Sequence, residues 1–332
     1  MLRLPWFEHR TPRTVAEAAK ILAGEGPAAM LVAGGTDLLP NMKRKHQTPK
    51  LLVSLKGVSS LRGFSSGTFG AGLTLREVVE NKSTPTALRQ AAAQVATPQI
   101  RNMATLGGNL CLDTRCTYYN QNYEWRQAID FCLKKDGQTC WVATASKRCV
   151  AVSSTDTAPA LIALEANVVL SGASGEREIP VESLYKNDGI DYLTRRADEI
   201  LTAVKVPAGW KSTYWKLRRR GSFDFPILGV AVALRFDSDS SIQEARIALG
   251  AAASRPFLVD KASEYLKGRK LTDEVIVEAS AMIANRAKPM DNTDMDLYWR
   301  KEVADDFAGY ALRELRGDDM RETRLRVARY AV

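Results

Sequence analysis

Four cysteines lie close together in the middle of the sequence, and thiolates are ligands that soft metals prefer. Cys116, Cys132, Cys140 and Cys149 fall within 34 residues of a chain that has only one other cysteine, Cys111. The stretches between them are 15, 7 and 8 residues long, and no C-x2-C pair occurs, so neither a zinc ribbon nor a bacterial ferredoxin spacing fits. Spacing alone leaves two interpretations open, a metal site and a group of free thiols.

The rest of the composition narrows the kind of metal site. The two histidines, His9 and His46, are far from the cysteines in the sequence, so we expect all-thiolate ligation, which suits zinc or an iron–sulfur cluster. No secretory signal is evident, and the longest apolar run, 227–234, is too short for a membrane span. We therefore expect a cytoplasmic protein with no membrane partner, where cysteines occur as thiols or metal ligands rather than disulfides.

Two Gly-Gly loops form a second candidate site. One is Val32-Ala-Gly-Gly-Thr-Asp37, between a short apolar stretch and a predicted helical turn, and the other lies within Ala104-Thr-Leu-Gly-Gly-Asn-Leu110. Glycine lets backbone N–H groups approach a phosphate closely, and a following helix adds its N-terminal dipole. Neither loop has the G-x-G-x-x-G spacing of a Rossmann fold, and each loop taken singly is also consistent with a tight turn.

The elements that must position these residues divide the chain into three parts. Residues 1–57 read as a small lobe and 58–210 as a second lobe, interrupted at about 112–152 by the cysteine-rich stretch. Residues 211–332 read as a third unit, with strands followed by helices, which is typical of an α+β fold. The expected strands are 30–33, 51–55, 69–73, 168–170, 200–206, 227–236 and 242–252, and the main expected helices are 86–96, 260–267, 272–288 and 296–315.

The chain carries a net charge of +9, which on its own is compatible with a nucleic-acid or acidic protein partner. The basic residues are spread along the sequence, and no zinc-finger or RNP pattern occurs. We therefore expect no nucleic-acid partner.

The two glycine loops together resemble those of the flavin subunit of the molybdenum hydroxylase family. The runs 31–40 and 104–110 carry the resemblance, which also includes Thr97-Pro-Gln-Ile-Arg-Asn102, Glu199-Ile-Leu201 and Tyr214-Trp-Lys216 and covers nearly the whole chain. It implies a two-lobed FAD-binding domain of the PCMH-like type and a C-terminal α+β domain. It also implies that the chain carries no catalytic residue, because the substrate site lies on a partner subunit.

The same resemblance implies which residues bind FAD. Those that should wrap the pyrophosphate are Leu31, Val32, Ala33, Gly34, Gly35, Thr36, Asp37 and Leu38. Those that should hold the ribityl and phosphate region from the other lobe are Thr105, Gly107, Gly108 and Asn109. Asp156, Leu201 and Lys216 should lie near the flavin. From the residues alone, a helix N-cap remains the alternative role for Asp156, and a surface cation remains the alternative for Lys216.

The cysteine segment resembles one branch of that family, the 4-hydroxybenzoyl-CoA reductases. The likeness is carried by Cys111-Leu-Asp-Thr-Arg-Cys116, Tyr118-Tyr119, Tyr123-Glu-Trp125 and Asp130-Phe-Cys132. It implies a [4Fe–4S] cluster whose ligands are Cys116, Cys132, Cys140 and Cys149, with Cys111 outside the ligand set. The aromatic residues would shield the cluster or pack the insertion.

The resemblance further implies an electron-transfer subunit within a dimer of heterotrimers. The partners would be a large molybdopterin subunit and a small [2Fe–2S] subunit. Reduced ferredoxin would supply electrons through the cluster and FAD, and the enzyme would reductively dehydroxylate 4-hydroxybenzoyl-CoA to benzoyl-CoA. The alternatives are a flavin subunit of a xanthine or CO dehydrogenase-type hydroxylase, a zinc-stapled scaffold, and an iron–sulfur sensor or nucleic-acid-binding regulator.

The charges of the insertion predict how ferredoxin would be recognised. Its basic residues are Arg115, Arg126, Lys134, Lys135, Lys147 and Arg148, and its acidic residues are Glu124, Asp130 and Asp136. This excess predicts a mildly basic surface that would attract an acidic ferredoxin.

Overall fold

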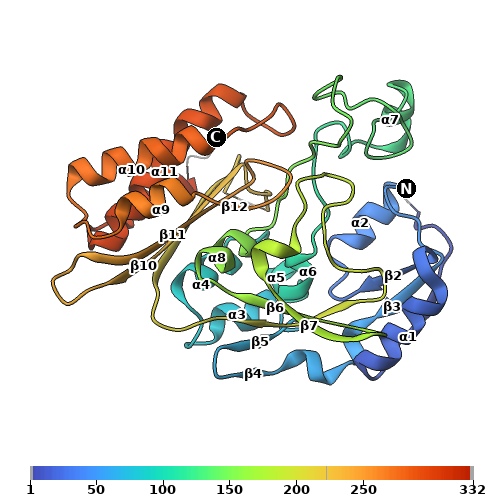
Figure 1. Cartoon of the computed structure of the whole chain (residues 1–332). Coiled ribbons are helices and arrows are strands. Elements are labelled where there is room, and N and C mark those ends of the chain that lie inside the picture. The colour runs from blue at the N-terminus through green and yellow to red at the C-terminus, as the bar shows by residue number, and fades with distance from the viewer. Residues whose placement is uncertain (1–2, 222, 330–332) are drawn as a thin grey trace.

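The N-terminal part of the chain is a small parallel sheet covered by one helix. The computed structural model describes residues 3–221 and 223–329. Strands β1 (Glu8–Arg10), β3 (Leu51–Ser54) and β2 (Ala29–Val32) lie side by side in that order. Helix α1 (Val15–Glu25) begins at Thr14, whose side chain accepts a hydrogen bond from the Glu17 amide, and buries Ala18, Ala19 and Leu22 against the sheet. Strand β2 leads through the first glycine loop into α2 (Leu38–Lys43) (Figure 1).

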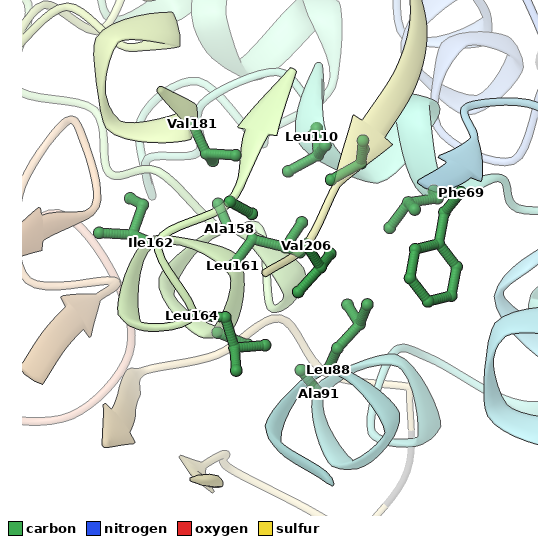
Figure 2. Packing of buried hydrophobic residues seen from close by; sticks show 14 of the residues in the cluster. Phe69, Leu88, Ala91, Leu110, Ala158, Leu161, Ile162, Leu164, Val181 and Val206 are labelled. Atoms are coloured by element: carbon green, nitrogen blue, oxygen red, sulfur yellow. The ribbon is translucent and has the colours of Figure 1, made fainter. Parts of the chain in front are cut away.

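The second part is a five-stranded antiparallel sheet packed against short helices. Its strands, in spatial order, are β4 (Phe64–Ser65), β5 (Thr68–Gly70), β8 (Ile200–Lys205), β6 (Asn167–Gly172) and β7 (Gly175–Pro180). The helices are α3 (Leu75–Glu80), α4 (Thr86–Ala93), α5 (Pro98–Arg101), α6 (Leu106–Leu110) and α8 (Thr157–Ala163). Every residue of α8 is buried, and Leu161 of α8 and Leu88 of α4 enter the same core (Figure 2). This core fixes the second glycine loop, which opens α6.

The third part is an antiparallel sheet with helices on both faces. Its order is β12 (Phe257–Leu258), β11 (Ile242–Gly250), β10 (Leu228–Phe236) and β9 (Lys211–Leu217). The helices that follow are α9 (Asp260–Leu266), α10 (Asp273–Arg286), α11 (Leu297–Arg316) and α12 (Arg321–Arg329). Along β10, Val230 and Val232 belong to the core with α9–α11, while Ala231 and Ala233 belong to the core with α4 and α8. The period of two in a strand therefore places small residues against the second part and larger ones against the C-terminal helices.

The cysteine segment leaves the body between α6 and α8 and lies beside α2 (green in Figure 1). Within the described chain its only regular helix is α7 (Tyr123–Ala128). Arg115 and Val152 close its base, because each backbone N–H donates to the other residue's carbonyl at 2.8 and 2.7 Å. Asn292 of the C-terminal part holds both ends, with its Nδ2 donating to the Val150 carbonyl at 2.6 Å and its carbonyl accepting from the Thr117 amide at 2.9 Å.

The α+β class predicted from the sequence is confirmed, and so are the long helices. The expected helices 260–267, 272–288 and 296–315 correspond to α9, α10 and α11 within two residues. Helices α7 and α12 and strand β7 were not predicted from the sequence, because they are short or strongly charged and give little apolar periodicity. No helix in the described ranges is long and apolar enough to cross a membrane.

Candidate functional site

The first glycine loop presents unpaired backbone N–H groups. Residues 31–38 are all half-buried, and Gly35 has a φ of +70°, a conformation that favours glycine. No described residue accepts a hydrogen bond from the amides of Gly34, Gly35 or Thr36. Unpaired amides in a glycine turn that leads into a helix suit an anionic group such as a phosphate.

The second glycine loop, in contrast, is hydrogen-bonded to the segment that follows β5. The amides of Leu106 and Gly107 donate to the carbonyls of Leu73 and Ala71 at 2.9 and 2.8 Å, and the Gly108 amide donates to Thr105 Oγ1 at 3.1 Å. Gly108 itself is exposed. A ligand at this loop would therefore meet the open face of Gly108 rather than a set of free amides.

Asn109 of the second loop ties α6 to the start of α8. Its Oδ1 accepts from the Thr155 hydroxyl, the Thr157 hydroxyl and the Thr157 amide at 2.8, 2.6 and 3.2 Å. With this oxygen occupied, the side-chain NH2 group is the part of Asn109 that a ligand could engage.

The two glycine loops touch although about seventy residues separate them in the sequence. A Cβ built on Gly34 would lie 2.0 Å from the Met103 carbonyl oxygen and 3.1 Å from the Ala104 Cα. Only glycine permits this backbone approach. The structure thus brings together the two loops that the sequence analysis assigned to one ligand.

Asp156 and Lys216, both predicted to lie near the flavin, are bound to each other. Lys216 Nζ donates to Asp156 Oδ2 at 3.0 Å and to the carbonyls of Gln94 and Asp224 at 2.9 Å, and the Tyr214 hydroxyl donates to Asp156 Oδ1 at 2.8 Å. Burial raises the pKa of Asp156 and lowers the pKa of Lys216, while the ion pair opposes both shifts. Lys216 is therefore not a surface cation, and the Asp156 side chain makes no N-cap hydrogen bond. The remaining predicted residue, Leu201, packs in the core of the second part.

Arg115 joins the first glycine loop to the cysteine segment. Its guanidinium pairs with Asp37 Oδ1 through Nη2 and donates to Asn41 Oδ1 through Nη1 at 2.9 Å, while its plane lies over the Phe225 ring. Burial raises the pKa of Asp37, and the Arg115 charge acts in the opposite direction. The residue directly before Cys116 thus stabilises the carboxylate that ends the glycine loop.

Breaking the Arg115–Asp37 pair is expected to destabilise the protein more than removing both charges. Arg115→Gln leaves a carboxylate that is only 27% exposed without its partner, and we expect a loss of about 3 kcal/mol in the free energy of unfolding. The double variant Arg115→Gln/Asp37→Asn should recover most of that loss. Urea unfolding of the wild type, Arg115→Gln, Asp37→Asn and the double variant measures the coupling energy between the two side chains. An equal loss of stability in Arg115→Gln and in the double variant would contradict this coupling.

All four predicted cysteine ligands line a single pocket. Cys116, Cys132, Cys140 and Cys149 are each buried and line one small pocket. Within the described residues, no three His, Cys, Asp or Glu side chains converge closely enough to hold one metal ion. Cys111 is not among the residues that line this cavity.

The pocket thiols are buried, and two of them accept backbone hydrogen bonds. Burial raises the pKa of Cys116 to about 12 and that of Cys149 to about 11, whereas backbone amides act in the opposite direction. The Ala151 amide donates to Cys149 Sγ at 3.4 Å. Thiols with such pKa values are protonated at neutral pH unless a bound cation displaces the proton.

Several residues in or near the pocket were not predicted from the sequence to lie there. Trp141 lines the cavity and donates from Nε1 to the Phe131 carbonyl at 2.5 Å, and Lys134 lines it as well. His46, far away in the sequence, stacks on Tyr119 with ring centroids 4.2 Å apart but does not line the cavity. Burial lowers the pKa of His46 to about 4, so it is a neutral packing residue at pH 7.

The aromatic residues of the insertion divide between the two expected roles. Tyr118 lines the cavity, whereas Tyr119 bonds Asp113 through its hydroxyl at 2.8 Å. Tyr123 packs against Phe131 and Trp125 against Tyr118, with ring centroids 5.6 and 6.3 Å apart. Of these four aromatic residues, Tyr118 alone lines the pocket, and the other three pack the segment around it.

The expected basic surface on the insertion is wrong. Arg115, Arg126 and Lys134 turn inward, with side chains at most 6% exposed. The basic residues left at the surface are Lys135, Lys147 and Arg148, and they are matched by the exposed acidic residues Glu124, Asp130 and Asp136. Counting charged residues in the sequence predicted the wrong surface charge, because a count does not distinguish buried arginines and lysines from exposed ones.

Two family models together match most of the chain. Residues 6–209 match the FAD binding domain in molybdopterin dehydrogenase, and residues 212–315 match the CO dehydrogenase flavoprotein C-terminal domain. The boundary between the two matches falls between β8 and β9.

Similar proteins span almost the same length. The carbon monoxide dehydrogenase medium chain of Hydrogenophaga pseudoflava is 26% identical over 93% of this chain and 96% of its own. The aldehyde oxidoreductase FAD-binding subunit PaoB of Escherichia coli is 30% identical over 78% of this chain and 86% of its own. A solved carbon monoxide dehydrogenase from Hydrogenophaga pseudoflava superimposes with a TM-score of 0.75 at 25% identity, covering 94% of this chain and 97% of that one.

The fold and the two apposed glycine loops define a flavin-binding subunit of an oxidoreductase. The chain belongs to the FAD-binding medium subunits of the molybdenum hydroxylase family, the type that occurs in carbon monoxide and xanthine dehydrogenases. This membership argues against a nucleic-acid-binding regulator.

Proposed function

We propose that FAD binds across the two glycine loops, with its pyrophosphate on residues 31–38 and its ribityl and phosphate region against Thr105, Gly107, Gly108 and Asn109. The unpaired amides of Gly34, Gly35 and Thr36 support this placement, since they offer donors that no described residue uses. The open face of Gly108 supports it from the other lobe. When bound, FAD supplies two-electron and one-electron redox chemistry, and these residues hold and orient it.

Asp156, Leu201 and Lys216 are proposed to border the flavin ring. Their support is the resemblance to the family's flavin subunits, and the Asp156–Lys216 ion pair adds a fixed, buried dipole in that region. Because all three Lys216 N–H groups are already used, the pair would act on the flavin by position and field rather than by a direct hydrogen bond.

We further propose that the cysteine pocket holds a [4Fe–4S] cluster. The single observation that carries this proposal is that four cysteines spread over 34 residues line one cavity while Cys111 does not. Four thiolates suit zinc as well as an iron–sulfur cluster, and the resemblance of the cysteine segment to the 4-hydroxybenzoyl-CoA reductases favours the cluster. Such a cluster supplies one-electron transfer close to the flavin loop that Arg115 contacts.

The chain would then act as an electron-transfer subunit, assembled with a large molybdopterin subunit and a small [2Fe–2S] subunit as a dimer of heterotrimers. Names such as medium chain and FAD-binding subunit for the similar proteins support a multi-subunit enzyme. Substrate chemistry would take place on a partner subunit, as the resemblance to the family implies.

Two reactions remain candidates for the assembled enzyme. The resemblance of the insertion favours reductive dehydroxylation of 4-hydroxybenzoyl-CoA, with electrons entering from ferredoxin through this chain. The similar proteins favour the other candidate, a hydroxylase that sends electrons outward, since they include carbon monoxide, xanthine and nicotinate dehydrogenases. Because the surface charge of the insertion is balanced, electrostatics no longer supports ferredoxin as the electron donor. The support that remains for ferredoxin is the cysteine pocket.

Anaerobic purification of the complex with analysis of flavin, iron, sulfide and zinc is the decisive experiment. About one FAD and four iron atoms in this chain are expected. Zinc in place of iron would establish the scaffold alternative. Assays with reduced ferredoxin plus 4-hydroxybenzoyl-CoA, and with xanthine, aldehyde or CO plus an artificial acceptor, then distinguish the two reactions.

Serine substitutions should separate the four pocket cysteines from Cys111. Cys116→Ser, Cys132→Ser, Cys140→Ser and Cys149→Ser should each lose most of the iron and keep most of the FAD, because serine is a poor ligand for iron and the glycine loops remain intact. Cys111→Ser is the matched control and should keep both. Iron retained in the Cys116 variant and lost in the Cys111 variant would overturn the ligand set.

A further inference from the structure

Lys134 places a buried positive charge at the wall of the cysteine pocket. Its side chain is 6% exposed and lines the cavity together with the four cysteines. The next residue, Lys135, has a side chain that is 31% exposed and pairs with Asp136 at 3.1 Å. Two adjacent lysines therefore face different surroundings, one inside the pocket wall and one at the surface.

The ammonium of Lys134 is held rigidly. Nζ donates to Asp113 Oδ1 and Thr114 Oγ1 at 2.8 Å and to the Gly189 carbonyl at 2.6 Å, which uses all three N–H groups. The Tyr119 ring lies 4.7 Å from Nζ and adds a cation–π contact. The charge therefore stays at one place in a low-dielectric setting, where its field is strong.

The anchor of this ammonium is in direct contact with a pocket cysteine. A Cβ on Gly189 would lie 2.6 Å from Cys149 Sγ, and the Gly189 amide donates to the Cys149 carbonyl at 2.9 Å. Gly189, whose carbonyl accepts a hydrogen bond from Lys134, is thus packed on Cys149. No described residue other than Asp113 supplies an opposite charge to Lys134 within ion-pair distance.

We propose that Lys134 is a positioning residue that sets the reduction potential of the cluster in the cysteine pocket. The inference rests on the proposed [4Fe–4S] site. Four thiolates around a cluster carry net negative charge, and reduction adds one electron. A fixed, buried ammonium stabilises the reduced state more than the oxidised state and so raises the potential, while the Asp113 carboxylate acts in the opposite direction.

Two variants that should shift the reduction potential in opposite directions test this assignment. The potential is measured in the purified complex by a redox titration that is monitored by electron paramagnetic resonance. Lys134→Met should lower the potential, changing the ratio of reduced to oxidised cluster at a fixed potential by at least about tenfold, which is about 59 mV for a one-electron couple. Asp113→Asn should raise the potential. Lys134→Arg keeps the charge and should stay near the wild-type value.

Lys135→Met is the matched control, because it removes the same charge one residue along, where solvent screens it. It should shift the potential far less than Lys134→Met. A cluster with equal potentials in the wild type, Lys134→Met and Asp113→Asn would overturn the role of Lys134 and leave the cluster itself in place. Absence of a [4Fe–4S] signal in the wild-type complex, beyond the signals of the [2Fe–2S] subunit, would overturn both proposals. If Lys134→Met fails to retain the cluster, Asp113→Asn still decides the sign of the effect, and Lys134→Arg serves as the variant that keeps the charge.

Discussion

Replacing Gly34 with alanine is expected to strip FAD from the protein. The added Cβ would lie 2.0 Å from the Met103 carbonyl oxygen, and the neighbouring atoms are backbone, so the two glycine loops must move apart. Overpacking of this kind costs about 1–3 kcal/mol of stability. The same displacement separates the two halves of the proposed FAD site, and each 1.4 kcal/mol lost from binding weakens affinity about tenfold.

Gly24→Ala is the matched control for this change. Gly24 lies in α1, nothing approaches its Cβ position within 4 Å, and alanine favours a helix more than glycine does. FAD content after gel filtration and the dissociation constant from flavin fluorescence should match the wild type for Gly24→Ala and fall sharply for Gly34→Ala.

Gly108→Ala separates cofactor contact from loop packing. Its Cβ would meet only the Thr105 hydroxyl, at 2.9 Å, and the glycine is exposed. FAD affinity should therefore fall with a smaller loss in thermal stability than for Gly34→Ala. If both variants fold and keep full flavin content, the assignment of these loops to FAD is wrong.

The sequence was informative where a local pattern decides the structure. The first glycine pair was predicted between a strand and a helical turn, as found, and the long C-terminal helices followed from their 3.6-residue periodicity. The four cysteines were grouped correctly by their density in the chain, although their spacing matched no known motif. In each case the signal lies within one continuous segment of the chain.

What the sequence did not reveal depends on long-range burial. Arg115 and Lys134 read as surface charges, yet both are buried beside carboxylates from other segments, Asp37 and Asp113. His46 read as remote, although the fold stacks it on Tyr119. A charged residue is buried only when tertiary contacts supply its partner, and those contacts are not encoded in the local pattern. The link between the glycine loop and the cysteine segment was missed for this reason.

Removing the cysteine segment while keeping Arg115 is expected to leave FAD bound and to abolish electron input through this chain. The base of the segment allows a precise cut, because Arg115 and Val152 already exchange both backbone hydrogen bonds. A two-residue Asn-Gly turn in place of residues 116–151 suits such a pair. A cut that began before Arg115 would leave Asp37 unpaired and would confuse loss of the cluster with damage to the flavin loop.

The shortened chain also needs Asp113→Asn, since the cut removes both Lys134 and Tyr119, the partners of that carboxylate. In the assembled enzyme, turnover with reduced ferredoxin should fall below roughly a tenth of the wild-type rate, a barrier increase of at least about 1.4 kcal/mol. A small artificial donor that reduces the flavin directly should still support turnover. Cys116→Ser, which keeps the segment but loses iron, should behave in the same way. Normal turnover of the shortened enzyme with ferredoxin would show that the segment is structural, because electrons would then reach the flavin without the cysteine pocket.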